Sequence, residues 1–305
     1  MAVEQRSPNA GSAPGAGAPD AAATRIFHPT DFSAASDVAF VHALKLALVS
    51  RGDLTVFHFA EEAEAAEGTH GFPRVRETLT QWGLLPPGSP REAVGATLGL
   101  RVRKVEVGGH DPADSILGFL KSHPADLIVL ATHQRGGVAR WLYREVATPL
   151  MHRSALPALF VPPGVDGFVD FHTGEVRLRR ILMPIDQQPH PRLVLTALPG
   201  IVRTFHEGPV EVTLLHVGTA ATQPHVNLPQ AEGWTWTTDV MEGDVVDVIL
   251  EKAAAGPADL LVLATQGRDG FLDALRGTTT ERVVRGARCP VLAIPTDAPG
   301  AARDA

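Results

Sequence analysis

The sequence has little of several features that mark particular classes of protein. Its 305 residues include one cysteine, so no intrachain disulfide can form and no oxidising compartment is required. No run reaches the roughly 18 apolar residues of a membrane span, and the N-terminus lacks the basic and apolar parts of a secretory signal. The net charge is −7 and the sequence has no long basic run, so it lacks the electrostatic features of a nucleic-acid binder. We therefore expect a soluble cytoplasmic protein that binds neither nucleic acid nor membrane.

Several motifs of enzymes and metal sites are also missing. The sequence contains neither the P-loop pattern G-x-x-x-x-G-K-[ST] nor the dinucleotide fingerprint G-x-G-x-x-G. Its 13 histidines do not form H-x-x-x-H or H-E-x-x-H spacings, and no C-x-x-C occurs. These absences argue against a P-loop ATPase, an NAD enzyme and a histidine-based metal site. We predict no catalytic residue and no metal ligand.

The length and composition suggest two domains with short tails. Residues 1–23 are rich in Ala, Gly, Pro and Ser, and we interpret them as a disordered tail. The first domain is expected at 24–163 and the second at 179–297, followed by a tail at 298–305. Residues 164–178 are expected to be a linker, because they contain Gly164, Gly167 and Gly174 and follow Pro163. A short strand-like piece is expected at 167–171.

The two halves repeat each other. Pro124–Thr132 reads PADLIVLAT and Pro257–Thr265 reads PADLLVLAT, so the segments differ only at Ile128 and Leu261. The openings of the two halves, Arg25–Asp31 and Arg180–Asp186, also correspond. The repeat is far longer than a solenoid period, so it indicates two domains of one fold.

Strands and helices alternate in both halves, which predicts a parallel sheet covered by helices on both faces. The apolar runs predict strands at 25–29, 54–59, 100–107, 127–131 and 158–161, and at 180–185, 210–217, 235–241, 260–264 and 291–294. Helices are expected at 34–50, 73–85, 111–121, 138–153, 191–206, 244–255 and 278–286, with a further short helix before residue 100. Ligands of such sheets bind at the carboxyl ends of the strands.

The stretch from Ala264 to Pro295 has the parts of a phosphate site. An apolar strand leads into a glycine-containing loop, and Gly277-Thr278-Thr279 opens a helix. The first backbone N–H groups of a helix have no partner within the helix, and the helix dipole favours an anion there. The sequence therefore predicts that an anionic ligand binds at this loop.

Both halves resemble universal stress protein domains. The resemblance implies two tandem Rossmann-like (adenine nucleotide alpha hydrolase-like) α/β domains, each a five-stranded parallel sheet of order 3-2-1-4-5 with helices on both faces. It also implies an ATP loop of pattern G-x-x-G-(nine residues)-G-[ST]. Gly267, Gly277 and Thr278 fit this pattern, and Ala264 replaces its first glycine. The expected ligand is ATP, with or without Mg²⁺.

The corresponding loop of the first half has lost the pattern. Ala131, Gln134, Arg144 and Glu145 stand at its four positions. Glu145 places a carboxylate where a phosphate would lie, and like charges repel. We predict that the first domain does not bind ATP in the manner of the family.

The resemblance carries over to specific positions of the second half. It implies that Asp186 contacts adenosine and that Val217 lines the adenine pocket. From the residues alone, Asp186 could equally be a helix cap or a turn residue, a cap is expected of Asp31 in the first half, and Val217 could pack in the core. Arg268 can reach phosphate or pair with a neighbouring aspartate. The predicted nucleotide-binding set is Pro184, Ile185, Asp186, Val217, Leu263, Ala264, Gly267, Arg268, Gly277, Thr278 and Thr279.

The resemblance predicts a stress-response protein that binds ATP in its second domain and acts as a nucleotide-dependent regulator or scaffold. The alternatives are a nucleotide-free interaction scaffold and a slow ATPase. The final strands, 158–161 and 291–294, are expected to pair and make an intrachain pseudo-dimer. A homodimer and an unknown protein partner remain open. Three histidines and the one cysteine are interpreted as buried structural residues: His28, His58, His216 and Cys289.

Overall fold

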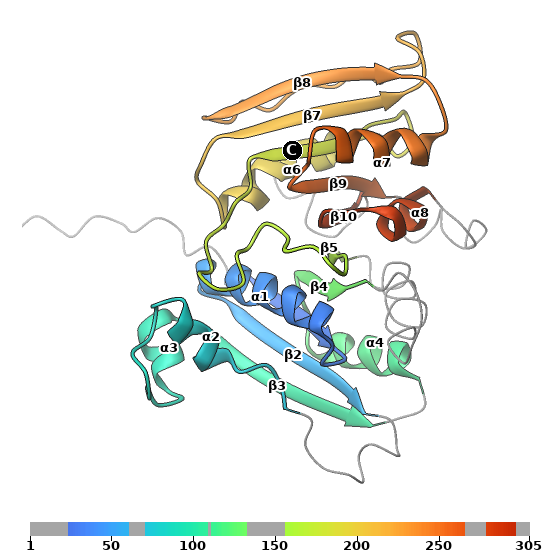
Figure 1. Ribbon diagram of the computed structural model, residues 1–305. Coiled ribbons are helices and arrows are strands. Elements are labelled where there is room, and N and C mark those ends of the chain that lie inside the picture. The colour runs from blue at the N-terminus through green and yellow to red at the C-terminus, as the bar shows by residue number, and fades with distance from the viewer. Residues whose placement is uncertain (1–23, 61–70, 109–110, 133–155, 266–278, 297–305) are drawn as a thin grey trace, which may run out of the picture.

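The computed structural model describes residues 24–60, 71–108, 111–132, 156–265 and 279–296 (Figure 1). Within these ranges the strands form one ten-stranded sheet in the order β3-β2-β1-β4-β5-β10-β9-β6-β7-β8. Each half of this order reads 3-2-1-4-5 from its outer edge to the centre. The fold class predicted from the sequence is therefore confirmed.

The elements of the first half follow the predicted alternation. They are β1 (Arg25–Thr30), α1 (Ala34–Val49), β2 (Asp53–Ala60), α2 (Val75–Gln81), α3 (Ala93–Leu98), β3 (Arg101–Gly108), α4 (Pro112–Ser122), β4 (Leu127–Ala131) and β5 (Ala158–Val161). The predicted helix at 138–153 lies outside the described residues.

The second half repeats the first. Its elements are β6 (Arg180–Pro184), α6 (Arg192–Arg203), β7 (Val210–Val217), β8 (Trp234–Met241), α7 (Val245–Ala255), β9 (Leu260–Thr265), α8 (Thr279–Gly286) and β10 (Val291–Pro295). All neighbouring strands within each half are parallel.

The two halves join through their last strands, as predicted. β5 and β10 are antiparallel, with Leu159 opposite Leu292 at the centre of the pairing. The strands consist of short apolar runs that are buried on both sides of the sheet. One chain therefore makes a continuous sheet from two domains, which is the predicted intrachain pseudo-dimer.

Helices cover both faces of the sheet. The buried residues of α1, α2, α3 and α6 belong to one apolar cluster, and those of α4, α7 and α8 belong to the other. Three helices begin close to the predicted positions with a side-chain cap: Ser33 accepts from the N–H of Ser36 before α1, Asp111 caps α4 and Asp244 caps α7. The prediction for α2 was too long, because the helix ends before Gly83, which has a positive φ of 72°.

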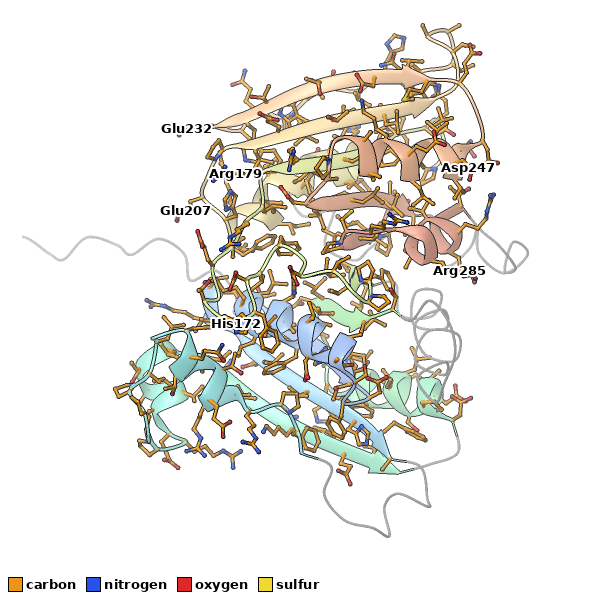
Figure 2. The ribbon with its side chains drawn as sticks, viewed as in Figure 1. His172, Arg179, Glu207, Glu232, Asp247 and Arg285 are labelled. Carbon is orange, nitrogen blue, oxygen red and sulfur yellow. The ribbon has the colours of Figure 1, made fainter. Side chains whose placement is uncertain are left out.

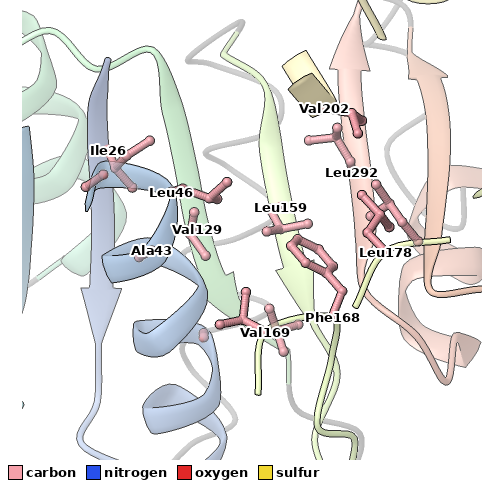
Figure 3. Packing of buried hydrophobic residues seen from close by; sticks show 14 of the residues in the cluster. Ile26, Ala43, Leu46, Val129, Leu159, Phe168, Val169, Leu178, Val202 and Leu292 are labelled. Carbon is pink, nitrogen blue, oxygen red and sulfur yellow. The ribbon is translucent and has the colours of Figure 1, made fainter. Parts of the chain in front are cut away.

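The segment expected to be a linker is a packed hairpin. Val169 and Val176 form an antiparallel bridge, while Phe168, Val169 and Leu178 are at most 2% exposed. Figure 3 shows Phe168 beside Leu159 of β5, near Leu178 and Leu292. The tip of the hairpin carries His172, which Figure 2 labels. Its Nδ1 lies 2.8 Å from Nε2 of Gln81, the last residue of α2. The hairpin is thus part of the core, and the domain limits drawn through it remain predictions.

No helix in the described part of the chain is long and apolar enough to span a membrane. The two predicted tails and the acidic residues 61–70 lie outside the described ranges.

Candidate functional site

The carboxyl ends of three strands bring the predicted ligand residues to one edge of the second domain. β6 lies between β7 and β9 and is parallel to both. Its end leads to Asp186, the end of β7 is Val217, and the end of β9 contains Ala264. The chain runs from β6 outward to β7 and β8 and then crosses back to β9, so the strand order reverses between β6 and β9, the usual ligand position in such a sheet.

Asp186 is exposed and is not a helix cap. Its Oδ1 accepts the N–H of Gln187 at 2.7 Å. α6 begins only at Arg192, and its N-cap, Pro191, makes no side-chain cap hydrogen bond. The capping interpretation of Asp186 is therefore wrong. The carboxylate stands at the carboxyl end of β6 with its second oxygen able to accept from a ligand hydroxyl.

The apolar members of the predicted set combine packing with partial exposure. Val217 is half-buried and packs against the cluster under α7 and α8. Ala264 is half-buried against the opposite cluster, while Leu263 and Ile185 are buried. Pro184 is half-buried at the last position of β6. Core packing of Val217 is thus established, and contact with a base would be an additional role.

The phosphate end of the predicted site is described only in part. Thr279 is the first residue of α8 and is exposed. Arg282, one turn further along α8, has Nη2 3.5 Å from Oδ1 of Asp244, the residue that caps α7. Gly267, Arg268, Gly277 and Thr278 lie outside the described residues, as do Gln134, Arg144 and Glu145 of the first domain. Their roles remain predictions.

A buried histidine behind Asp186 belongs to the same edge, and the sequence reasoning did not connect it with the site. His216 is 2% exposed. Its Nδ1 lies 3.2 Å from the carbonyl oxygen of Ile185, and its Nε2 lies 2.9 Å from Oγ1 of Thr222. The histidine thus links the backbone that enters Asp186 with the loop that follows β7.

The first domain repeats this histidine. His58 has Nδ1 2.9 Å from the carbonyl oxygen of Thr30, and these two residues are partners in the β1–β2 register. Ile185, the residue directly after β6, and His216 of β7 occupy the corresponding positions. The prediction that His58 and His216 are structural histidines with hydrogen-bond partners is confirmed. A histidine at the end of the second strand in both halves was the available sequence signal.

The neighbouring aspartates differ sharply between the domains. Oδ1 of Asp31 accepts hydrogen bonds from the N–H of Ser33 and from the hydroxyls of Ser33 and Ser36, at 3.1, 2.7 and 2.8 Å. The N-cap of α1 is Ser33, so the expectation that Asp31 is the cap is wrong. Asp31 instead accepts a hydrogen bond from the hydroxyl of that cap residue. The carboxylate of Asp31 is therefore engaged by its own helix, whereas that of Asp186 faces outward.

The residue after each aspartate differs as well. Phe32 has a φ of 59°, and its ring stacks on His58 with centroids 4.1 Å apart. Phe72 meets the Phe32 ring edge-on at 5.4 Å. The second domain has polar Gln187 at the equivalent position. At this position the first domain therefore has an aromatic side chain packed on its histidine, and the second has a polar one.

Other titratable groups in the core fit structural roles. Burial lowers the pKa of His28 to about 4, although its Nδ1 lies 2.8 Å from the carbonyl of Val129. The prediction that His28 is a core histidine with hydrogen-bond partners is only half correct, because its buried Nε2 has no partner in the described part of the chain. Burial raises the pKa of the Cys289 thiol to about 12, which removes it as a nucleophile. Within the described ranges, no three His, Cys, Asp or Glu side chains gather into a potential metal site.

Comparison with known proteins agrees with the fold. The sequence model of the Universal stress protein family matches residues 23–162 and 225–295, more than half of the chain. A curated universal stress protein of Methanocaldococcus jannaschii is 40% identical over 57 residues, which is 19% of this chain and 34% of that protein. The match spans about a third of the length of this relative.

Two solved structures are similar over most of the chain. A universal stress protein from Archaeoglobus fulgidus has 16% sequence identity and a TM-score of 0.53, covering 89% of this chain and 96% of its own. A protein from Pseudomonas aeruginosa has 14% identity and a TM-score of 0.54, with coverages of 90% and 94%. At these identities the likeness concerns the fold.

Proposed function

Because this chain belongs to the universal stress protein family, we propose that it is a stress-response protein that binds ATP in its second domain. The protein with ATP bound would differ in its surface from the protein without ATP, and this difference would regulate a partner. A ligand shifts such an equilibrium only if it binds the two states with different affinities. The proposal gives the protein a regulatory or scaffolding role and no rapid catalysis.

The contrast between Asp186 and Asp31 carries the proposal. Asp186 is exposed at the point where the strand order reverses, and its only described hydrogen bond comes from the N–H of Gln187. Asp31 accepts from three donors of its own domain. One aspartate is thus left for a ligand, and its pseudo-symmetric counterpart serves the first domain's helix.

The proposed roles follow from position. Asp186 would accept hydrogen bonds from the adenosine part, and half-buried Val217 would contact the base. The loop that begins at Ala264 and ends in Gly277, Thr278 and Thr279 would surround the phosphates with backbone N–H groups at the start of α8. Arg268 would add a guanidinium to the phosphate end.

The scaffold without nucleotide is the second candidate. Ala264 favours it, because the family pattern has glycine there and a Cβ lies where the backbone must approach the phosphates. The methyl group of Ala264 is half-buried, and in this reading it weakens ATP binding by holding the phosphates away from the backbone.

Isothermal titration of ATP with Mg²⁺ into the full chain separates the candidates. We expect one site per chain, which Gly277→Asp abolishes by placing a carboxylate beside the phosphates. Circular dichroism and thermal unfolding of the variant control for folding. Two sites would mean that the first domain binds as well. No heat, from protein that carries no copurified nucleotide, would favour the scaffold.

A further inference from the structure

Two loops of the second domain are tied together at the edge that contains Asp186. Nε2 of Gln187 donates to the carbonyl oxygen of Thr222 at 3.4 Å. The backbone N–H of Gln187 also donates to Asp186 at 2.7 Å. Gln187 therefore connects Asp186, the residue proposed to bind adenosine, with the loop that follows β7.

The loop after β7 is a compact turn built around one hydroxyl. Oγ1 of Thr222 accepts the N–H of Thr219 at 3.1 Å, and the N–H of Thr222 donates to the carbonyl of Thr219 at 3.0 Å. Nε2 of His216 completes the arrangement at 2.9 Å from the same hydroxyl. The hydroxyl is thus the common partner of the turn and of the buried histidine.

Close packing leaves little freedom in this turn. A Cβ on Gly218 would lie 2.7 Å from Nε2 of His216 and 2.8 Å from Oγ1 of Thr222. Glycine is therefore required where the backbone passes over the histidine. Both Thr219 and Thr222 are exposed, so the turn presents its outer surface to whatever binds at the edge.

We propose that Gln187 and residues 218–222 form the wall of the second-domain site on its nucleoside side, with His216 as the residue that positions it. The inference rests on the proposed function. His216 holds the carbonyl before Asp186 through Nδ1 and the hydroxyl of Thr222 through Nε2. One imidazole thereby sets the distance between the carboxylate that meets the nucleoside and the wall beside it.

The assignment separates two ends of one site. The turn follows β7, on the side of β6 away from β9, whereas the phosphate loop follows β9 on the other side. Loss of the hydrogen bond between His216 and Thr222 should therefore weaken contacts to the nucleoside and leave contacts to the phosphates unchanged. A residue with a merely structural role would weaken both.

The test is titration of the full chain with adenosine, ATP and inorganic tripolyphosphate. Thr222→Val keeps the shape of an exposed side chain and removes the hydroxyl. Because a hydrogen bond contributes on the order of 1 kcal/mol, we expect about five- to tenfold weaker binding of adenosine and ATP. Tripolyphosphate affinity should not change, and Thr222→Ser should bind like the wild type.

A second variant separates the two contacts of the histidine. His216→Asn retains a donor for the carbonyl of Ile185 but is too short to reach Thr222. It should show the same loss for adenosine and ATP as Thr222→Val, with unchanged tripolyphosphate binding. Thermal unfolding of each variant checks that the fold is retained.

The outcomes distinguish this inference from the function on which it rests. Wild-type protein that binds neither adenosine nor ATP overturns both. Wild-type binding that Thr222→Val leaves intact overturns the wall alone. An equal loss for adenosine and tripolyphosphate assigns Thr222 to general stability and likewise contradicts the wall.

Discussion

His42 of α1 holds Phe168 of the interdomain hairpin in two ways. Nε2 of His42 accepts the backbone N–H of Phe168 at 3.1 Å, and the two rings meet edge-on with centroids 4.7 Å apart. Nε2 also accepts the N–H of Val169 at 3.2 Å. On its other side, Phe168 stacks on Phe205, just after α6, at 5.7 Å. The hairpin therefore joins the first helix of one domain to the corresponding helix of the other.

This contact makes stability depend on pH. Nδ1 of His42 lies 2.8 Å from the carbonyl of Val38, so Nδ1 carries the proton and Nε2 must stay unprotonated. Burial lowers the pKa of His42 from 6.5 to about 4. The folded protein therefore binds fewer protons than the unfolded chain between these values. Stability is complete above about pH 6.5 and falls as the pH drops towards 4.

The expected slope can be measured by urea unfolding between pH 4.5 and 7.5. Each such histidine contributes up to about 1.4 kcal/mol per pH unit. Burial lowers the pKa of His28 to about 4 as well, so both contribute. His42→Gln, which can offer an amide oxygen to the two N–H groups, should reduce the slope by the share of one histidine. An unchanged slope would show that His42 is not neutral in the folded state.

Gly167 should be intolerant of any side chain. Its φ is 72°, and an added Cβ would collide with the ring of His42. We expect Gly167→Ala to lower the free energy of unfolding by about 2–4 kcal/mol, from backbone strain plus the clash.

Gly164→Ala is the matched control for this substitution. Gly164 has a similar φ of 73°, but nothing lies within 4 Å of an added Cβ. It should cost about 1 kcal/mol from strain alone. The difference between the two variants, measured by urea unfolding, is the contribution of the contact with His42. Equal losses of unfolding free energy in the two variants would mean that the hairpin shifts away from His42 without losing stability.

Much of the fold was predictable because the apolar runs are short and the repeat is strong. The runs at 127–131 and 260–264 are buried strands whose length and alternation with helices leave few topologies. The hairpin was missed as a core element because its glycines and proline indicate a turn, and only the tertiary contact with His42 reveals its burial. The link from His216 to Thr222 was missed for a similar reason. It depends on a turn whose shape sequence spacing does not specify.

Cys289 should be inert in the folded protein. The side chain is 7% exposed, and burial, with the nearby charge of Asp259, raises the pKa of its thiol to about 12. Only the thiolate is an effective nucleophile, so modification by a disulfide reagent at pH 8 should require unfolding. We expect no reaction in native buffer and one thiol per chain in guanidinium chloride. Rapid reaction of the native protein would show that β10 opens readily at its start.

The two aspartates that follow the first strands should respond to substitution in opposite ways. Asp186→Ala removes an exposed carboxylate that, among the described residues, accepts one hydrogen bond, from the N–H of Gln187. We expect a change in stability within about 0.5 kcal/mol, as for an exposed surface position, and at least tenfold weaker binding of ATP.

Asp31→Ala removes an acceptor of three hydrogen bonds around the cap of α1. Because the donors of Ser33 and Ser36 lose their partner, the variant should be about 2–3 kcal/mol less stable. Its ATP affinity should equal that of the wild type. Urea unfolding and titration of both variants make a cross-comparison in which each serves as the control of the other. The opposite pattern, with ATP binding lost in Asp31→Ala and kept in Asp186→Ala, would move the nucleotide site to the first domain, against the intramolecular bonds that engage its aspartate.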